Sequence, residues 1–183
     1  MRTLAAGLLV VLLTGCASVA LAPRAPQPFD LLGYFLVTYS GGAVTANLRW
    51  EHSSEQDQIW LMTPTGQTLA YIVDSAQGAT LTRADQQQYR ASSVEALTRQ
   101  ALGWSLPLSL LQYWVRGEPA PGSVPVAAER GVDGHLLALT QRGWRVELTH
   151  YPDGDMKGRV RRLDLNDGAN EIRLVIDTWR DAT

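Results

Sequence analysis

The 183-residue sequence contains a single cysteine, Cys16, and no excess of basic side chains. One cysteine excludes a disulfide framework and any zinc cluster built from cysteine ligands. Sixteen Lys and Arg against eighteen Asp and Glu give a net charge of −2, so no basic surplus is present to neutralise a nucleic-acid backbone. The apolar fraction of 45% is nevertheless sufficient for the core of one domain.

The sequence also lacks a hydrophobic run of membrane-spanning length. The apolar stretch Leu4–Leu13, which follows Arg2, has ten residues, whereas a spanning helix needs about 20. It is typical of the central region of a secretory signal. Residues 13–16 read Leu-Thr-Gly-Cys and resemble the bacterial lipobox, in which the cysteine is lipidated. We therefore predict a lipoprotein signal peptide at residues 1–15 and lipidation of Cys16; the alternative is an ordinary signal peptide with an incidental cysteine.

Residues 16–32 are predicted to form a tether between the lipid and a folded domain at residues 33–183. Pro23, Pro26 and Pro28 each remove a backbone donor and prevent a regular helix here. Two or more acyl chains on one cysteine anchor a protein stably. Ala17 follows the cysteine, and the absence of an aspartate at this position favours the outer membrane. The expected location is therefore the outer membrane, lipid-anchored and facing the periplasm.

The domain itself alternates between polar and apolar residues with the period of a β-strand. In residues 44–51, Val44, Ala46, Leu48 and Trp50 share one face, which predicts a half-buried antiparallel strand. In the fourth strand the same reasoning places Leu69 on the buried face together with Tyr71. Turn signals between similar runs predict about ten strands, at residues 33–39, 44–51, 58–62, 68–73, 79–83, 88–90, 135–140, 144–151, 160–165 and 171–179.

Two helical segments interrupt the strands. Ser92 and Glu95 form a capping-box pattern before a helix at residues 93–102, and Pro107 suits the first turn of a second helix at residues 108–115. Strands, two helices and strands again predict an α+β fold with one curved antiparallel sheet. Two short helices cover only part of such a sheet, so either the sheet closes on itself or an apolar cavity remains.

Several segments resemble the LolB family, the outer-membrane lipoprotein receptors of Gram-negative bacteria. Besides the lipobox at Cys16, the matching segments are residues 46–50, 61–66, 102–108, 113–117, 143–146, 163–165, 172–174 and 177–179. The resemblance implies an unclosed β-barrel with a helical lid over an apolar cavity. It implies a receptor that takes lipoproteins from the periplasmic carrier LolA and passes them to the inner leaflet of the outer membrane. We expect a monomer without cofactor or metal.

The cavity that the resemblance implies would be lined from both the sheet and the lid. On the sheet we expect Leu48, Trp50, Leu61, Leu69, Tyr71, Trp144, Val146, Leu174 and Ile176, and on the lid Leu97, Leu111 and Trp114. A plain hydrophobic core is the alternative for each of these residues. The family's membrane-insertion loop, which usually reads Pro-Leu-Gly, corresponds here to Pro64, Thr65 and Gly66, so this loop lacks the leucine.

Two other classes of function stay open. A structural lipoprotein that scaffolds an envelope assembly complex would have a filled core and a large exposed apolar patch. An enzyme would need a polar constellation in a cleft, yet His52, His135 and His150 pair with no nucleophile and show no metal spacing in the sequence.

Overall fold

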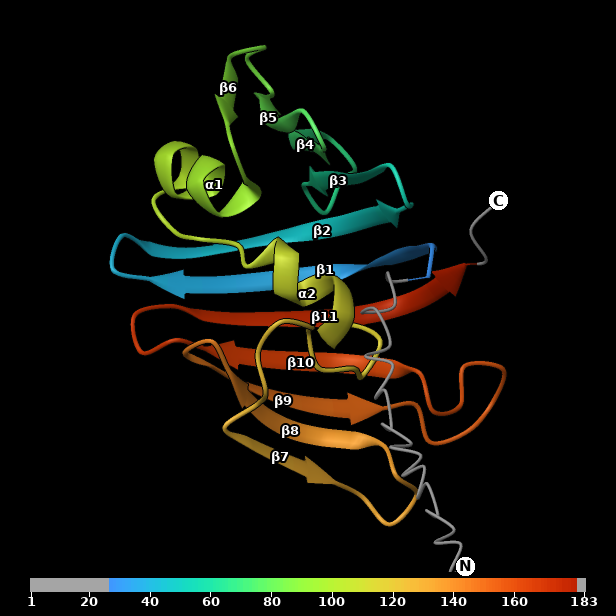
Figure 1. Ribbon diagram of the computed structural model, residues 1–183. Coiled ribbons are helices and arrows are strands. Elements are labelled where there is room, and N and C mark those ends of the chain that lie inside the picture. Colours follow the sequence, from blue (N-terminus) through green and yellow to red (C-terminus); the bar gives the residue numbers. More distant parts are fainter. Residues whose placement is uncertain (1–26, 181–183) are drawn as a thin grey trace, which may run out of the picture.

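The structure, a computed structural model, describes residues 27–180 (Figure 1). The predicted signal peptide at 1–15, Cys16 and the tether up to residue 26 lie outside the described residues. Within residues 27–180, no helix is long and apolar enough to cross a membrane.

One antiparallel sheet of eleven strands forms the frame of the domain (Figure 1). Its spatial order is β6-β5-β4-β3-β2-β1-β11-β10-β9-β8-β7, so the first and last strands pair at the centre. The two edge strands β6 and β7 do not pair with each other, and the barrel is therefore unclosed, as expected. The strands are β1 Phe29–Tyr39, β2 Gly42–His52, β3 Gln56–Met62, β4 Thr68–Ser75, β5 Gly78–Arg83, β6 Gln88–Ala91, β7 Ala127–Arg130, β8 Leu136–Gln141, β9 Trp144–His150, β10 Val160–Asn166 and β11 Glu171–Arg180.

Most strand boundaries lie within two residues of the sequence prediction, but β7 and the start of β1 differ more. Strand β7 was not predicted, because its four residues are all exposed and show no alternation. Strand β1 begins at Phe29 rather than Gly33, so residues 29–32 belong to the sheet and not to the tether. A register shift between Leu32 and Gly33 in the pairing with β11 interrupts the period of two there.

Gly33 is required by this irregularity. A Cβ atom at this position would lie 1.9 Å from the backbone oxygen of Val175 on β11. Real Cβ atoms do not approach a backbone oxygen so closely, so the two strands pair in this register only with glycine at position 33.

The concave face of the sheet carries the core. Ala46, Leu48 and Trp50 of β2 are buried, as the alternation predicts. On β11 Ile172, Leu174 and Ile176 are buried in the same way. The predicted face is therefore confirmed for β11 and for β2 from Ala46 onward, whereas Val44, predicted on the same face, is 37% exposed.

The prediction for β4 was wrong. The buried residues are Ala70 and Ile72, whereas Leu69 is 40% exposed and Tyr71 lies on the outer face. This strand has apolar residues on both faces, so alternation alone could not choose between them. The register with β3 decides, because it sets Leu61 opposite Ala70 and Ile59 opposite Ile72.

Two helices, α1 (Val94–Leu102) and α2 (Leu108–Trp114), lie over the concave face between β6 and β7 (Figure 1). Ser93, not Ser92, caps α1, since its hydroxyl accepts a hydrogen bond from the backbone N–H of Ala96 at 3.3 Å. Val94 and Leu97 are buried on the inner side of α1, which packs against β5 and β6. The two helices and the loop between them form what we call the lid.

Candidate functional site

A wholly apolar pocket lies between the concave face of the sheet and the lid. Its twelve lining residues are Phe35, Leu48, Trp50, Ile59, Leu61, Ile72, Trp104, Leu106, Leu108, Leu111, Ile172 and Leu174. An apolar pocket therefore lies where the cavity was expected, and its volume is about 30 Å³. That volume has room for about two water molecules.

The pocket contains only some of the residues predicted for it. Leu48, Trp50, Leu61, Leu111 and Leu174 line it. A second group is buried in the same core but outside the pocket: Leu97, Trp114, Trp144, Val146 and Ile176. Leu69 and Tyr71, the two residues from the misplaced face of β4, contribute nothing to it. The hydroxyl of Tyr71 instead donates to Oε1 of Gln58 at 2.6 Å, and its ring packs at 5.0 Å against Trp60.

Sequence reasoning missed seven of the lining residues. Ile59 and Ile72 follow from the register of β3 and β4, which the sequence alone does not specify. Phe35 and Ile172 lie on predicted strands, and the alternation of apolar and polar residues in those strands could have identified them as lining residues. Leu108 is the first residue of α2, while Trp104 and Leu106 belong to the irregular loop between the helices, where no periodicity exists.

The centre of the lid is this loop. Trp104 is 3% exposed, and its ring centroid lies 6.0 Å from that of Phe35 on β1. Leu106 is only partly buried and marks the outer side of the pocket. Both side chains line the pocket from the lid rather than from the sheet.

Hydrogen bonds to α1 hold the loop and the start of α2. The Thr98 hydroxyl accepts from the backbone N–H of Leu106 at 2.9 Å and donates to the carbonyl of Val94. The Glu95 carboxylate accepts from the backbone N–H and the hydroxyl of Ser109 at 3.0 and 2.7 Å. Glu95, which the capping-box pattern assigned to the N-terminus of its own helix, thus joins α1 to α2.

The far end of the lid is fixed by the fully buried side chain of Gln141 on β8. Its Oε1 accepts from the indole Nε1 of Trp114 at 2.9 Å and from the backbone N–H of Ala120 at 3.0 Å. Its Nε2 donates to the carbonyls of Ala120 and Ser123, each at 2.7 Å. The lid is therefore attached at both ends and covers the pocket with its middle.

A family model described as "Outer membrane lipoprotein LolB" matches residues 27–179. The outer-membrane lipoprotein LolB of Chromobacterium violaceum is 34% identical over 179 residues, covering 94% of this chain and 95% of the relative. That of Thiobacillus denitrificans is 35% identical over 176 residues, covering 93% of this chain and 92% of the relative. The chain belongs to the LolB family.

Among solved structures, a LolA superfamily protein from Nitrosomonas europaea has a TM-score of 0.48 at 10% identity, covering 88% of this chain and 90% of that one. This likeness is too weak to support an argument. LolB family membership, by contrast, makes the chain an outer-membrane lipoprotein receptor in lipoprotein localisation.

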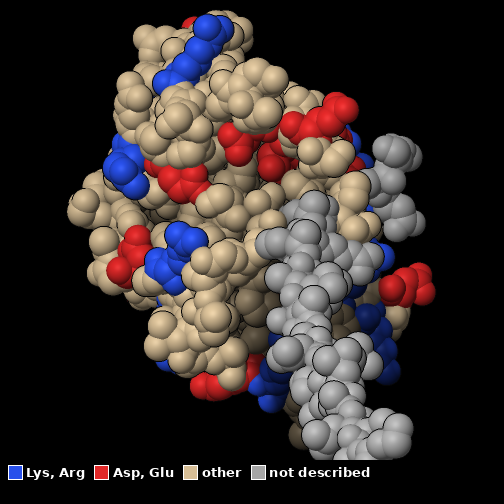
Figure 2. Space-filling view, viewed as in Figure 1, with Lys and Arg blue, Asp and Glu red and all other residues tan. Residues whose placement is uncertain are grey.

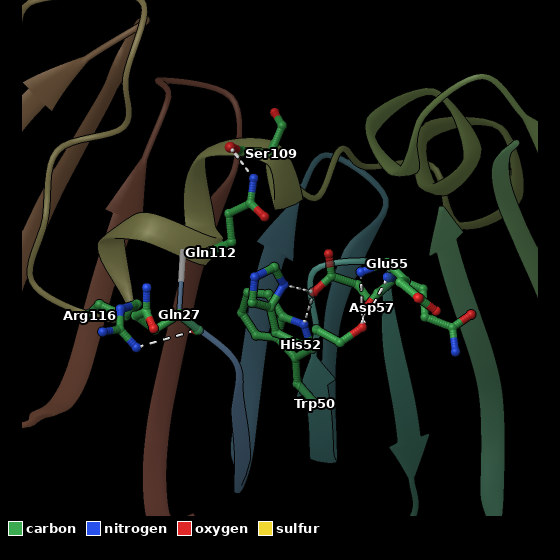
Figure 3. Close-up of polar contacts among 10 residues, drawn as sticks. Gln27, Trp50, His52, Glu55, Asp57, Ser109, Gln112 and Arg116 are labelled. Atoms are coloured by element: carbon green, nitrogen blue, oxygen red, sulfur yellow. Dashed lines mark hydrogen bonds and ion pairs between the residues drawn. The ribbon is translucent and has the colours of Figure 1, made fainter. Parts of the chain in front are cut away.

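One pocket residue of this LolB-family chain is held by a buried carboxylate. Asp57 of β3 accepts from the indole Nε1 of Trp50 at 2.6 Å, and the same oxygen lies 2.8 Å from Nδ1 of His52 (Figure 3). Both His52 and Asp57 are less than 10% exposed. The interaction fixes the orientation of the Trp50 ring, whose apolar part lines the pocket.

A second carboxylate lies directly across the strand pair from the first, since Asp74 of β4 is opposite Asp57. The pKa of Asp74 is raised to about 6. Partial burial is the largest cause, and the negative charges of Asp57 and Glu95 add to it. Acidic side chains gather on the upper part of the face that carries α1 (Figure 2). These carboxylates flank the lid and line no part of the apolar pocket.

The turn between β3 and β4 contains Pro64, Thr65 and Gly66, all of them exposed. The Thr65 hydroxyl hydrogen-bonds that of Thr63 at 2.8 Å, so the position occupied by leucine in the LolB pattern here presents a small polar group. Membrane insertion by this turn stays a prediction.

Among residues 27–180, no group of three or more His, Cys, Asp or Glu side chains could hold a metal ion. The rings of His135 and His150 stack at 4.9 Å, and burial together with the neighbouring His135 lowers the pKa of His150. The histidines that we considered for catalysis therefore pack against each other or, for His52, against Asp57.

Proposed function

We propose that this chain receives lipoproteins from the periplasmic carrier LolA, encloses their acyl chains between the sheet and the lid, and releases them into the inner leaflet of the outer membrane. The observation that supports this is the pocket, whose lining is apolar throughout and which lies beneath a lid attached at its ends. The proposal assigns no chemical reaction to the chain.

The lid has to move for this function. A methylene group is about as large as a water molecule, so an acyl chain of about sixteen carbons needs on the order of ten times the volume of the pocket. In the described conformation the lid is therefore closed over the pocket. Trp104 and Leu106 would move outward on loading, because they lie in the loop between the two attached helices.

The energetics require a shielded site. Burial of apolar chain is worth about 0.8 kcal/mol per methylene, so an exposed chain of about sixteen carbons costs roughly 12 kcal/mol in water. Transfer in one direction without a nucleotide-driven step requires only that affinity rises from carrier to receptor to bilayer. Each 1.4 kcal/mol of difference gives about a tenfold preference.

The anchor completes the proposal. Lipidation of Cys16 after removal of residues 1–15 would hold a monomeric domain on the membrane through the segment that ends at β1. Because β1 begins at Phe29, this tether is shorter by four residues than the sequence predicted.

The experiment is site-specific photo-crosslinking to a lipoprotein with radiolabelled acyl chains, delivered by purified LolA. The photoreactive residue replaces Leu61 of β3 or Leu106 of the lid, and Leu137 of β8 serves as the control. Leu61 and Leu106 line the pocket, while Leu137 is 42% exposed and lies outside it. We expect label at positions 61 and 106 and none at 137.

Equal labelling at all three positions, or none at any, would contradict enclosure in the pocket. If lipoprotein sorting also continued normally in cells depleted of the protein, the scaffold alternative would replace the receptor.

A further inference from the structure

A wide groove lies away from the lid pocket, at the end of the sheet where the chain enters β1. Its volume is about 850 Å³, and Gln27 and Pro28, which precede β1, form part of its wall. Phe29 and Trp179 supply aromatic surface, and the indole of Trp179 donates to the carbonyl of Val160 at 3.0 Å.

Arginine and lysine side chains from three parts of the chain line this groove. Arg116 follows α2, Lys157 and Arg159 come from the loop before β10, and Arg180 ends β11. His135 precedes β8, and no aspartate or glutamate is among the described residues that line the groove. Figure 2 shows basic side chains on the right of the view, where β10 begins and β11 ends, with acidic surface beside them.

The described contacts of Arg116 and Arg180 do not neutralise these two side chains. One Arg116 nitrogen donates to the carbonyl of Gln27 at 3.4 Å, a neutral acceptor (Figure 3). Arg180 lies 3.9 Å from Asp30, but that carboxylate already pairs with Arg49 at 3.2 Å. Asp133, Asp153 and Asp155 belong to the adjoining loops, and Oδ2 of Asp133 lies 3.9 Å from Nε2 of the groove residue His135.

An apolar residue stands beside these charges. Val132, at the tip of the turn between β7 and β8, is fully exposed, and the same turn supplies His135 to the groove. The turn is ordered by hydrogen bonds from Gly134 N–H to the Gly131 carbonyl and from Gly131 N–H to the His135 carbonyl, both at 2.9 Å. An exposed apolar tip next to basic side chains suits the boundary between headgroups and acyl chains.

The position of the groove agrees with a membrane contact. Only ten residues lie between Cys16 and Gln27, so eleven Cα–Cα steps give a reach of at most about 40 Å. The turn that contains Thr65 lies at the opposite end of the sheet, because β3 starts opposite the end of β2 and runs away from the chain entry.

We propose that this groove binds the phosphate groups of anionic phospholipid headgroups and seats the chain-entry end of the sheet on the bilayer, with Val132 among the headgroups. The inference rests on the proposed anchoring through Cys16. Guanidinium groups bind phosphate oxygens in pairs, and each basic residue near an anionic surface adds about a fivefold preference. An acidic protein partner would use the charges but has no need of the apolar tip or of the nearby anchor.

The experiment uses the full lipidated protein in phospholipid vesicles. With Cys16 lipidated, Val132→Cys provides a single free thiol for an environment-sensitive fluorophore, and Thr65→Cys is the matched site at the other end. Quenching by spin-labelled lipid is compared in vesicles of phosphatidylcholine alone and with added phosphatidylglycerol. We expect strong quenching at position 132, dependent on phosphatidylglycerol, and weak quenching at position 65.

Charge removal tests the groove itself. Arg116→Gln with Lys157→Gln should lower the ratio of docked to undocked protein about 30-fold, while Arg83→Gln with Arg90→Gln, on β5 and β6, should not. Free inorganic phosphate at constant ionic strength should compete only weakly; full competition would indicate a soluble-phosphate site and overturn the proposal. Equal quenching at positions 65 and 132, or loss of LolA binding without loss of quenching, would also overturn it. Crosslinking of cargo at Leu61, measured on the same variants, reports separately on the receptor function.

Discussion

The indole N–H of Trp114 donates to the side-chain oxygen of Gln141 at 2.9 Å, which joins the end of α2 to strand β8. The same glutamine side chain also accepts a hydrogen bond from the backbone N–H of Ala120 and donates one to its carbonyl. A single buried amide therefore determines where the lid ends and where the loop toward β7 begins.

Replacing this amide should cost stability. Gln141→Met keeps the size of the side chain but leaves the Trp114 and Ala120 N–H groups buried without acceptors, at about 1–3 kcal/mol each. We expect a loss of roughly 3 kcal/mol in urea unfolding. Gln88→Met, at an exposed position on β6, is the control and should change stability by less than about 0.5 kcal/mol. A similar effect at both sites would contradict the anchoring role.

Enlarging the pocket should change cargo uptake in addition to stability. Leu111→Ala removes a lining side chain from α2, and Leu148→Ala removes an equally buried leucine from β9 outside the pocket. Both should lose about 2–4 kcal/mol of stability. Only Leu111→Ala should change the rate at which the protein takes up lipoprotein from LolA, measured with a fluorescent acyl chain. Equal uptake changes in the two variants would argue against a specific pocket.

Asp74 should make stability depend on pH. Its pKa is raised from 3.8 to about 6, by partial burial first and then by Asp57 and Glu95, so the folded state holds the proton more tightly than the unfolded chain. Its contribution to stability is therefore fully present below pH 3.8 and is lost as the pH rises through about 6.

Asp74→Asn should accordingly stabilise the protein at pH 7 by about 1 kcal/mol, a value reduced for solvent screening. The gain should shrink below pH 6 and vanish near pH 4. Thermal melts across this range are the measurement, with Asp85→Asn at an exposed loop position as the control. A gain that did not vary with pH would contradict the assignment.

Gly33→Ala tests the close approach of β1 and β11. The added Cβ would meet the backbone oxygen of Val175, which no rotamer change can move aside. We expect a loss of more than about 3 kcal/mol in urea unfolding, and no recovery when Val175→Ala is added, because the clash is with backbone. Recovery in the double variant would show that the side chain, not the strand pairing, is the constraint.

The sequence predicted the sheet, the helical insert and most strands because one face of nearly every strand is polar. It failed where that contrast is absent. β4 is apolar on both faces, so Leu69 and Tyr71 were placed inside, and β7 is exposed on both, so it was missed. Trp104 and Leu106, which cover the pocket, lie in a loop without periodicity. The volume of the pocket depends on how these side chains pack, which no pattern of residue types specifies.

The pairing of β1 with β11 at the centre of the sheet also dictates when the protein can fold. Each half of the sheet can form its own hairpins early, but the concave surface is complete only after the last strand has emerged and found the first. Contacts so distant in sequence form slowly. If the chain enters the periplasm N-terminus first, its sheet stays incomplete until the final residues have crossed the membrane. During export it would therefore expose apolar surface to which chaperones bind.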